Sequence, residues 1–413
     1  MKKIIILLSI MVLSLNLNAQ TSISLEQVAE EVKQSNFTVL KNAQRVYQAK
    51  ETINFNKRNL LPRLNLWNVL KTPFSWKGAL DIVQDIAPFL VPGNWFKVGQ
   101  SKEFYFAYQE QYRALWANEV MTAKLLYINT LRDIDFLNTL KAQSMKIEEL
   151  VGIAETRQIF GSVEPRTTRF LKIKSLEVKE DIRVLQNLVF EEKKALAYLL
   201  GIDQEQELLL ENINFPKVGK LEPLKFDTFV FRALDSAPEL AQYKYLKQAL
   251  AYTRKEVTFS FLGASSNSQG VFNNIPVQDG LGFGAASSIR ISNSESHILD
   301  INKSSTEEVL KKSLYNLINN FNSFIGNIEN QTTRRRLAGE NYQTLRSHLA
   351  LGMDIDPLEM LKSVENEFDA SISLVNYNYE VVTTMERLKR MIFNGDYNKK
   401  ETKLENLLSG VQQ

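Results

Sequence analysis

The sequence predicts a mainly α-helical protein with a smaller β part, built from two duplicated halves. Two stretches far apart in the chain, residues 24–64 and 225–262, open the same succession of elements. Each is followed by a segment with strand-like alternation and then by two long helices. The distance between the copies far exceeds the roughly 20–50 residues of a solenoid repeat. The chain is therefore predicted to be a duplicated half-protein.

The first 19 residues read as a secretory signal peptide. Lys2 and Lys3 form its charged part, residues 4–17 its apolar core, and Ala19 offers a small residue for cleavage. The alternative is a membrane anchor, but the apolar run is interrupted by polar residues and is shorter than the roughly 20 residues that a spanning helix needs. We therefore expect the mature chain to be exported.

The first repeat covers residues 20–223. Residues 24–60 have the apolar spacing of a helical hairpin, which Pro62 ends. Strands are predicted at about 62–95, although Pro73 and Pro88 disturb the pattern. A helix is then expected from about 101 to 155, a turn at Gly161 and Pro165, and a second helix from about 167 to 200. Gly201 would end that helix.

The second repeat covers residues 224–395 and is followed by a tail at 396–413. Residues 257–262 and 281–291 alternate with period two, so strands are predicted at about 256–292. Long helices follow at about 302–350 and 357–393. The seam of the first of these steps by four and three through Leu310, Leu314, Leu317, Phe321, Phe324 and Ile328.

The second helix of the first repeat carries a similar seam. Its positions fall on alternating steps of four and three, and Ser175 and Glu192 occupy the two positions of this series that are not apolar. The apolar positions are Leu171, Val178, Ile182, Leu185, Val189, Leu196 and Leu199. A period of 3.5 residues predicts supercoiled packing of helix against helix. The helix expected at 302–350 would be roughly 75 Å long. Helices of this length predict an elongated coiled-coil body, and by themselves they also fit a plain coiled-coil protein.

The composition argues against several classes of function. The net charge of +3 arises from 50 basic and 47 acidic residues, which disfavours an extended nucleic-acid-binding face. The chain has no cysteine, and its two histidines, His297 and His348, lie far apart without the spacing of metal ligands. The glycine-rich run 280–285 precedes a strand-like pattern rather than a helix. We expect no enzyme activity, no cofactor and no metal site.

The order of these motifs resembles the TolC-like outer membrane efflux proteins, over nearly all of the mature chain. The resemblance lies in six places: residues 25–28, 36–40, 61–64 and 237–240, and the apolar–glycine pairs Phe160-Gly161 and Leu351-Gly352. It implies a homotrimer in the outer membrane, whose strands form a β-barrel and whose helices form a periplasmic α-barrel. Four strands per chain are too few to close a membrane barrel alone, which agrees with an oligomer.

The resemblance also implies a function as a passive conduit for small molecules or polypeptides. Such proteins work in tripartite efflux or type I secretion systems with a periplasmic adaptor and an inner-membrane pump. The strands predicted at about 62–95 would form a short first hairpin that prolines interrupt. This leaves open an alternative: a degenerate TolC-like scaffold of the envelope without a conducting channel.

The two helix turns, about 156–168 and 350–362, would form the tunnel tip that contacts the adaptor. The candidate residues for this contact are Gly161, Glu164, Arg166, Arg169, Gly352, Asp354, Asp356, Glu359 and Lys362. Members of the family often carry an aspartate several residues after the tip glycine, whereas here Glu359 and Lys362 occupy the comparable positions. A mixed set of charges would not attract cations in the same way. The alternative is that these are solvated polar residues at a helix turn.

Overall fold

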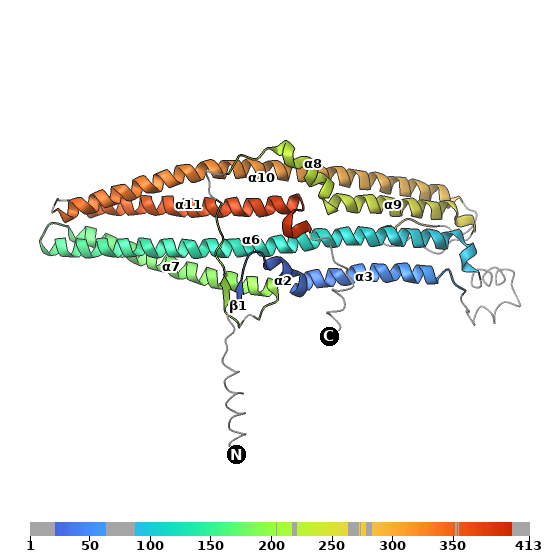
Figure 1. Cartoon of the computed structure of the whole chain (residues 1–413), viewed down its shortest axis with the longest axis horizontal. Coiled ribbons are helices and arrows are strands. Elements are labelled where there is room, and N and C mark those ends of the chain that lie inside the picture. The colour runs from blue at the N-terminus through green and yellow to red at the C-terminus, as the bar shows by residue number, and fades with distance from the viewer. Residues whose placement is uncertain are drawn as a thin grey trace, which may run out of the picture. The chain divides into compact units, whose positions relative to one another are not determined.

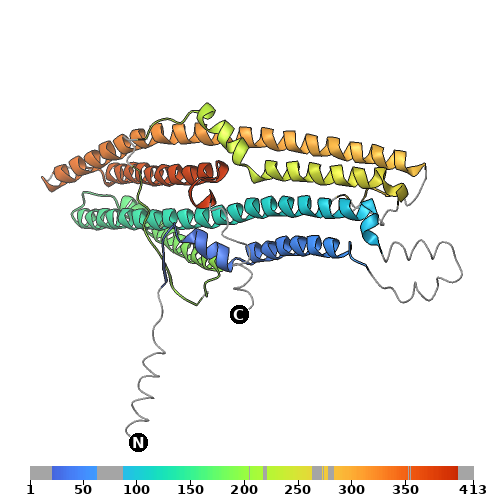
Figure 2. The same cartoon turned by 45° about the vertical axis from the view of Figure 1, so that its right-hand side comes forward.

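The computed structural model describes residues 21–62, 87–203, 205–216, 221–262, 272, 274–277, 283–351, 353 and 355–398. Figure 1 and Figure 2 show its elements from two directions. The predicted strands at 63–86, 263–271 and 278–282 and the tail beyond 398 lie outside the described residues, as do the signal peptide, Gly352 and Asp354. Among the described residues, no helix is both long and apolar enough to cross a membrane.

The predicted duplication of the helices is confirmed. Each helix of the first half has a counterpart of nearly equal length in the second, so that lengths of 22, 68 and 36 residues correspond to 21, 67 and 35. The pairs are α3 (Phe37–Arg58) with α9 (Pro238–Thr258), α6 (Pro92–Ile159) with α10 (Gly284–Ala350), and α7 (Pro165–Leu200) with α11 (Pro357–Met391). The shorter helices α2 (Val28–Ser35) and α8 (Phe226–Ser236) precede α3 and α9 in the same way.

The chain forms two compact units, and each draws elements from both repeats. Unit 1 contains Met1–Asn36, Val120–Lys225 and Asn316–Lys389, and unit 2 contains Phe37–Glu119, Phe226–Tyr315 and Arg390–Gln413. The long helices α6 and α10 therefore contribute to both units.

Unit 1 is a bundle in which α6 and α7 form an antiparallel pair, visible in both views (Figures 1 and 2). Lys172 binds Glu155 and Lys179 binds Glu148, each with an N–O distance of 2.7 Å. The two ion pairs are one heptad apart on both helices, as expected for a coiled coil. The core between α6, α7, α10 and α11 contains Ile147, Leu150, Ala154, Leu171, Val178, Tyr342, Met360, Leu361 and Val364.

A short parallel ribbon is attached to this bundle. Strand β1 (Thr21–Ile23) pairs with β2 (Leu208–Leu210), and the hydroxyl of Tyr127 lies 2.9 Å from the Ile23 carbonyl and 2.7 Å from the Glu211 carbonyl. Tyr127 is fully buried, and burial raises its pKa to about 12. The hydroxyl is therefore a neutral donor at physiological pH and holds the ribbon to α6.

Unit 2 contains α3, α8, α9, the first part of α6 and the first part of α10. Both views show α9 beside the first part of α10 (Figures 1 and 2). Its core contains Phe104, Ala107, Leu246, Ala249, Leu250, Val257, Phe272, Ile275 and Leu299. A buried polar layer adds hydrogen bonds between Asn56 and Ser101 (2.5 Å) and between Gln100 and Thr253 (2.6 Å). Such bonds favour one specific arrangement of the helices, because a buried amide without a partner is costly.

The strand prediction was wrong at both ends of the second predicted hairpin. Residues 256–258 end α9, Ser260–Leu262 form the 3-10 helix η4, and residues 284–292 belong to α10. The buried face of α10 begins with Ser288 and Ser292, which are 2% and 0% exposed. Because these buried positions are small polar residues, the apolar residues of this segment do not show the helical period. Their alternation with period two therefore predicted a strand where the structure has a helix.

The end of the first predicted hairpin is also helical. Pro88–Leu90 form the 3-10 helix η2, and α6 begins at Pro92 rather than near Ser101. Proline is well suited to a first turn because its missing N–H has no helical partner there. The expected ends of α7, α10 and α11 at about 200, 350 and 393 agree with the structure within a few residues.

Candidate functional site at the two helix turns

The α6–α7 turn, in unit 1, is closed by a glycine in the left-handed conformation. Gly161 has φ of 75°, its N–H donates to the Gln158 carbonyl (3.0 Å), and the Ser162 N–H donates to the Arg157 carbonyl (2.9 Å). These two bonds form the Schellman motif that satisfies carbonyls at a helix end. Pro165 then starts α7. The prediction of a glycine–proline turn is confirmed.

The α10–α11 turn belongs to the same unit and ends in a capped helix. The Met353 N–H donates to the His348 carbonyl (3.1 Å). The Asp356 carboxylate accepts a hydrogen bond from the Leu358 N–H at 2.9 Å, and Pro357 is the first residue of α11. Asp356, predicted as a contact residue, therefore acts as the N-cap of α11.

Arg157 connects the two turns. Its guanidinium donates hydrogen bonds of 2.9 Å to the carbonyl of Ile355 and 2.9 Å to the carbonyl of Met353. A planar guanidinium is suited to this because its N–H groups form a rigid fork. The sequence analysis did not identify Arg157, because its acceptors are backbone atoms and no sequence motif reveals them.

The described charged candidates all lie on the surface. Glu164, Arg166, Arg169, Asp356, Glu359 and Lys362 are exposed, as is Gly161. Glu359 and Lys362 are three residues apart in the first turns of α11 and hence lie on one face of that helix. No hydrogen bond or ion pair between the α7 candidates and the α11 candidates is found in the described part of the turns.

The sequence analysis did not choose the apolar side chains at the turns as contact residues. Ile159, Phe160 and Leu351 are 83%, 78% and 77% exposed, and Phe170, Met353 and Leu358 are also exposed. We call these six residues the apolar tip cluster. The sequence contained a signal for this cluster, because an apolar residue directly precedes each turn glycine. Large apolar side chains exposed together mark an interaction surface.

We expect two glycine-to-alanine substitutions to differ strongly. Gly161 (φ 75°) and Gly201 (φ 66°) both end a helix, but a Cβ at Gly161 meets no atom within 4 Å, whereas one at Gly201 would overlap the Ser35 side chain of α2. Gly161→Ala should therefore lower the free energy of unfolding only by the left-handed strain, about 1–2 kcal/mol. Gly201→Ala should cost clearly more, since α2 must also shift. Urea unfolding followed by circular dichroism measures both, and equal losses would contradict the argument.

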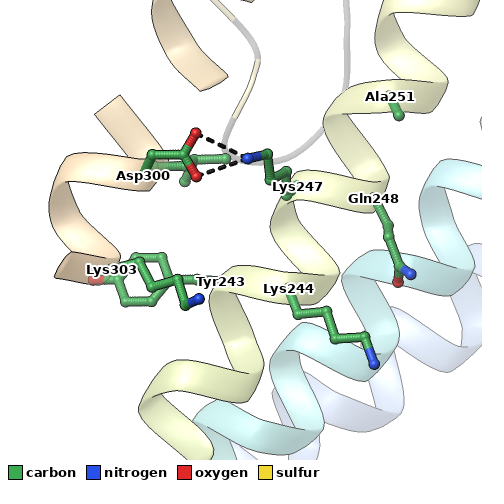
Figure 3. A pocket seen from close by; sticks show the side chains of 8 residues that line it. Tyr243, Lys244, Lys247, Gln248, Ala251, Asp300 and Lys303 are labelled. Atoms are coloured by element: carbon green, nitrogen blue, oxygen red, sulfur yellow. Dashed lines mark hydrogen bonds and ion pairs between the residues drawn. The ribbon is translucent and has the colours of Figure 1, made fainter. Parts of the chain in front are cut away.

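A hollow lies between α9 and α10, in unit 2 (Figure 3). It has a volume of about 360 Å³ and is lined by Lys244, Lys247, Lys303 and Asp300 among others. Lys247 binds both carboxylate oxygens of Asp300, at 2.7 and 2.8 Å, and these hydrogen bonds lower the pKa of Asp300. The pair is exposed to solvent, so the hollow is a solvated basic groove. Among the described residues, no group of His, Asp or Glu side chains is arranged to hold a metal ion.

Comparison with known proteins identifies the fold. No family model and no curated protein matches the sequence. The outer membrane channel CmeC of Campylobacter jejuni superposes with a TM-score of 0.72 at 13% identity, over 94% of this chain and 89% of that protein. The outer membrane protein VceC of Vibrio cholerae gives 0.70 at 13% identity, over 90% and 96%. The open-state outer membrane channel MtrE of Neisseria gonorrhoeae gives 0.65 at 11%, over 92% and 91%. The fold of this chain is that of the TolC-like outer membrane channels.

Proposed function

We propose that this protein is the outer-membrane channel component of a tripartite efflux or type I secretion system. It would be a passive conduit rather than an enzyme, with a large periplasmic part. The observation that carries this proposal is the structural similarity to outer membrane channels over 90–94% of the chain, at TM-scores of 0.65–0.72. The long paired helices and their duplication belong to the same architecture.

The exposed apolar faces support assembly into a homotrimer. On α7, the side chains turned away from its seam include Phe170, Ile173, Leu176, Val184, Leu188 and Phe190, which are 42–66% exposed. On α10, exposed apolar side chains include Ile291, Ile298, Ile301, Val309 and Leu337. Extended apolar faces of this kind are rare on monomeric proteins, because burying them is favourable. Neighbouring subunits would cover them.

The apolar tip cluster supports contact with a periplasmic adaptor, which would in turn bind an inner-membrane pump. It combines exposed apolar side chains with the charged residues Glu164, Arg166, Arg169, Glu359 and Lys362 around it. An apolar centre with a charged rim is the usual composition of a protein interface. Arg157 would hold the two halves of this surface in register.

Conductance of the purified full-length protein tests the proposal. We expect an oligomer that dissociates on heating and that opens discrete conductance steps in a planar lipid bilayer. A double variant, Phe160→Ser with Leu351→Ser, should leave the oligomer and its conductance intact but abolish efflux or secretion in cells. The matched control is Phe231→Ser, which removes a side chain that is 79% exposed on α8 in unit 2 and is not part of the tip cluster.

A water-soluble protein without conductance would contradict the channel proposal. If the protein had no conductance but bound an envelope partner, and the tip variant lost that binding, the result would favour the degenerate, non-conducting scaffold. Normal export by the tip variant would contradict the assignment of the tip cluster as the adaptor contact.

A further inference from the structure

The long helices of unit 1 form a layer with two unlike edges. Both views show α7 and α10 on opposite sides of the pair α6 and α11 (Figures 1 and 2). Each of these outer helices exposes apolar side chains, among them Leu188 of α7 (42% exposed) and Leu337 of α10 (53% exposed). Because the two edges differ, each can be covered by the other edge of a second copy. Such a contact repeats from copy to copy and can close a ring.

Two ion pairs to neighbouring residues of α6 fix the relative heights of the outer helices. Glu148 binds Lys179 of α7 (2.7 Å), and Glu149 binds Arg346 of α10 (3.0 Å). Lys179 and Arg346 therefore lie at about the same height. The chain of α7 runs away from the tip turns and that of α10 runs toward them, so residues equally far from this pair share a height as well. In a ring whose axis follows the helices, rotation carries each height of one copy to the same height of the next.

Complementary side chains occupy equal heights on the two edges. Leu188 and Leu337 each lie nine residues from the Lys179–Arg346 level, on the side away from the tip. Glu191 and Arg334 each lie twelve residues from it in the same direction. Glu191 and Arg334 are both exposed, and neither forms an ion pair within the part of the chain that the structure describes. A second copy would therefore offer each of these charges its missing partner.

A second pair of charges indicates the orientation of the contact. Arg183 of α7 is exposed and lies within two residues of the height of Glu340 of α10. Glu340 binds Arg336 of its own helix but is still 58% exposed, so its carboxylate can accept another cation. If α7 and α10 met in parallel at this place, Arg183 would approach Arg334 and Glu191 would approach Glu340. Like charges would then repel, so the pattern selects the antiparallel arrangement.

The α10 edge is also hollowed at this height. A groove of about 560 Å³ lies between α10 and α11, and its lining includes Thr333, Arg334, Leu337, Ala338 and Asn366. Leu188 has the same height as the apolar part of this lining and is placed to enter the groove of the next copy. Burying exposed apolar side chains in this way is favourable.

We propose that the α7 edge of one copy packs antiparallel against the α10 edge of the next, with Leu188 against the partner's Leu337 and Glu191 paired with the partner's Arg334. This contact rests on the homo-oligomer of the proposed function, and it specifies the register and the residues that each copy contributes. The apolar side chains supply most of the burial. The ion pair selects the register, because interfacial charges contribute more to specificity than to affinity.

Disulfide formation tests the register directly, because the chain has no cysteine. Purified full-length protein with both Leu188→Cys and Leu337→Cys should form covalent dimers and larger species on mild oxidation, visible in a non-reducing gel. Neither single variant should crosslink, since its cysteine then meets a leucine of the next copy. Leu188→Cys with Thr344→Cys is two helical turns out of register and should crosslink about tenfold less, since a disulfide needs Cα atoms within about 7 Å.

Charge reversal tests the ion pair. Glu191→Arg and Arg334→Glu should each lower the temperature at which the oligomer dissociates, and the double variant should regain most of that loss because the pair is restored with opposite polarity. The matched control combines Glu191→Arg with Lys312→Glu, which makes the same changes of charge but places the second one 22 residues from Arg334 along α10. This control should stay as heat-sensitive as Glu191→Arg alone. All substituted residues are exposed, and circular dichroism verifies that the variants fold.

Conductance of the same preparations separates this contact from the channel function. A conducting oligomer that neither crosslinks between positions 188 and 337 nor regains heat stability on double reversal would overturn the register and leave the channel proposal standing. Crosslinking by either single variant would also overturn it, because like edges would then meet. A crosslinked oligomer without conductance would support the contact and contradict the channel. A monomer would overturn both.

Discussion

Replacing Glu386 by leucine should lower the free energy of unfolding by about 3–5 kcal/mol, and replacing Lys124 by methionine should cost clearly less. Both side chains are 4% exposed, in the core of unit 1, and Lys124 Nζ lies 3.4 Å from Glu386 Oε2. Removing Glu386 takes a carboxylate away from a buried ammonium group. Weakening the charge compensation of a buried ion is costly in a protein core.

The difference between the two variants comes from Lys389. Its Nζ lies 2.5 Å from Glu386 Oε1, and its side chain is 45% exposed, so it reaches the carboxylate from the solvent side. When Lys124 is replaced, Lys389 still neutralises Glu386. When Glu386 is replaced, the half-exposed Lys389 can move into solvent, whereas the buried Lys124 cannot reach it.

Urea unfolding monitored by circular dichroism measures both losses. The double variant Lys124→Met with Glu386→Leu should recover most of the stability, because two apolar side chains then fill the place of the pair. Arg336→Ala, which breaks an exposed ion pair with Glu340, serves as the control and should change stability by less than about 1 kcal/mol. A double variant as unstable as Glu386→Leu would show that the pair is not responsible.

The helical part of the fold could be predicted because its signals are local. The seam predicted on α7 is confirmed: Leu171, Val178, Val189 and Leu196 are buried, and so is Ser175 in one of the missing places. Gly161 and Gly201 end helices as predicted, because a left-handed residue strongly favours glycine. The duplication was visible because both copies conserve the same order of elements.

The start of α10 could not be predicted, because Ser288 and Ser292 occupy its buried face. The hydrogen bonds of Arg157 to two backbone carbonyls depend on how two turns meet, and neither turn contains a motif for it. For the candidate site, the sequence analysis chose charged residues at the turns and missed the exposed apolar ones. Apolar residues in long helices are normally attributed to the core, so only their exposure in the structure separates them.

Glu192 fills the other missing place in the α7 seam, and we expect it to make the stability of unit 1 depend on pH. Burial and, to a smaller extent, the nearby charge of Asp133 raise its pKa from an ordinary value of 4.5 to about 7, against the opposing effect of Arg132. One guanidinium thus faces two carboxyl groups, with Arg132 Nε 2.9 Å from Asp133 Oδ1. Glu192 Oε2 is buried and has no hydrogen-bond partner.

The sign of the effect follows from the raised pKa. Below about pH 4.5 Glu192 is protonated in both the folded and the unfolded chain, and its contribution to stability is fully present. Between about pH 4.5 and 7 only the folded chain keeps the proton, so stability falls as the pH rises and then levels off. Because the side chain is only partly buried, solvent screening should reduce the total loss to about 1–2 kcal/mol.

Glu192→Gln keeps the shape of the protonated side chain and cannot ionise. In urea unfolding at a series of pH values, it should match the unmodified protein near pH 4.5 and exceed it by about 1–2 kcal/mol at pH 8. Glu191→Gln, at an exposed position on the same helix, should show no such growing difference. If the advantage of Glu192→Gln were the same at every pH, the seam carboxyl would not titrate near neutrality, and the pH dependence of the bundle would have another origin.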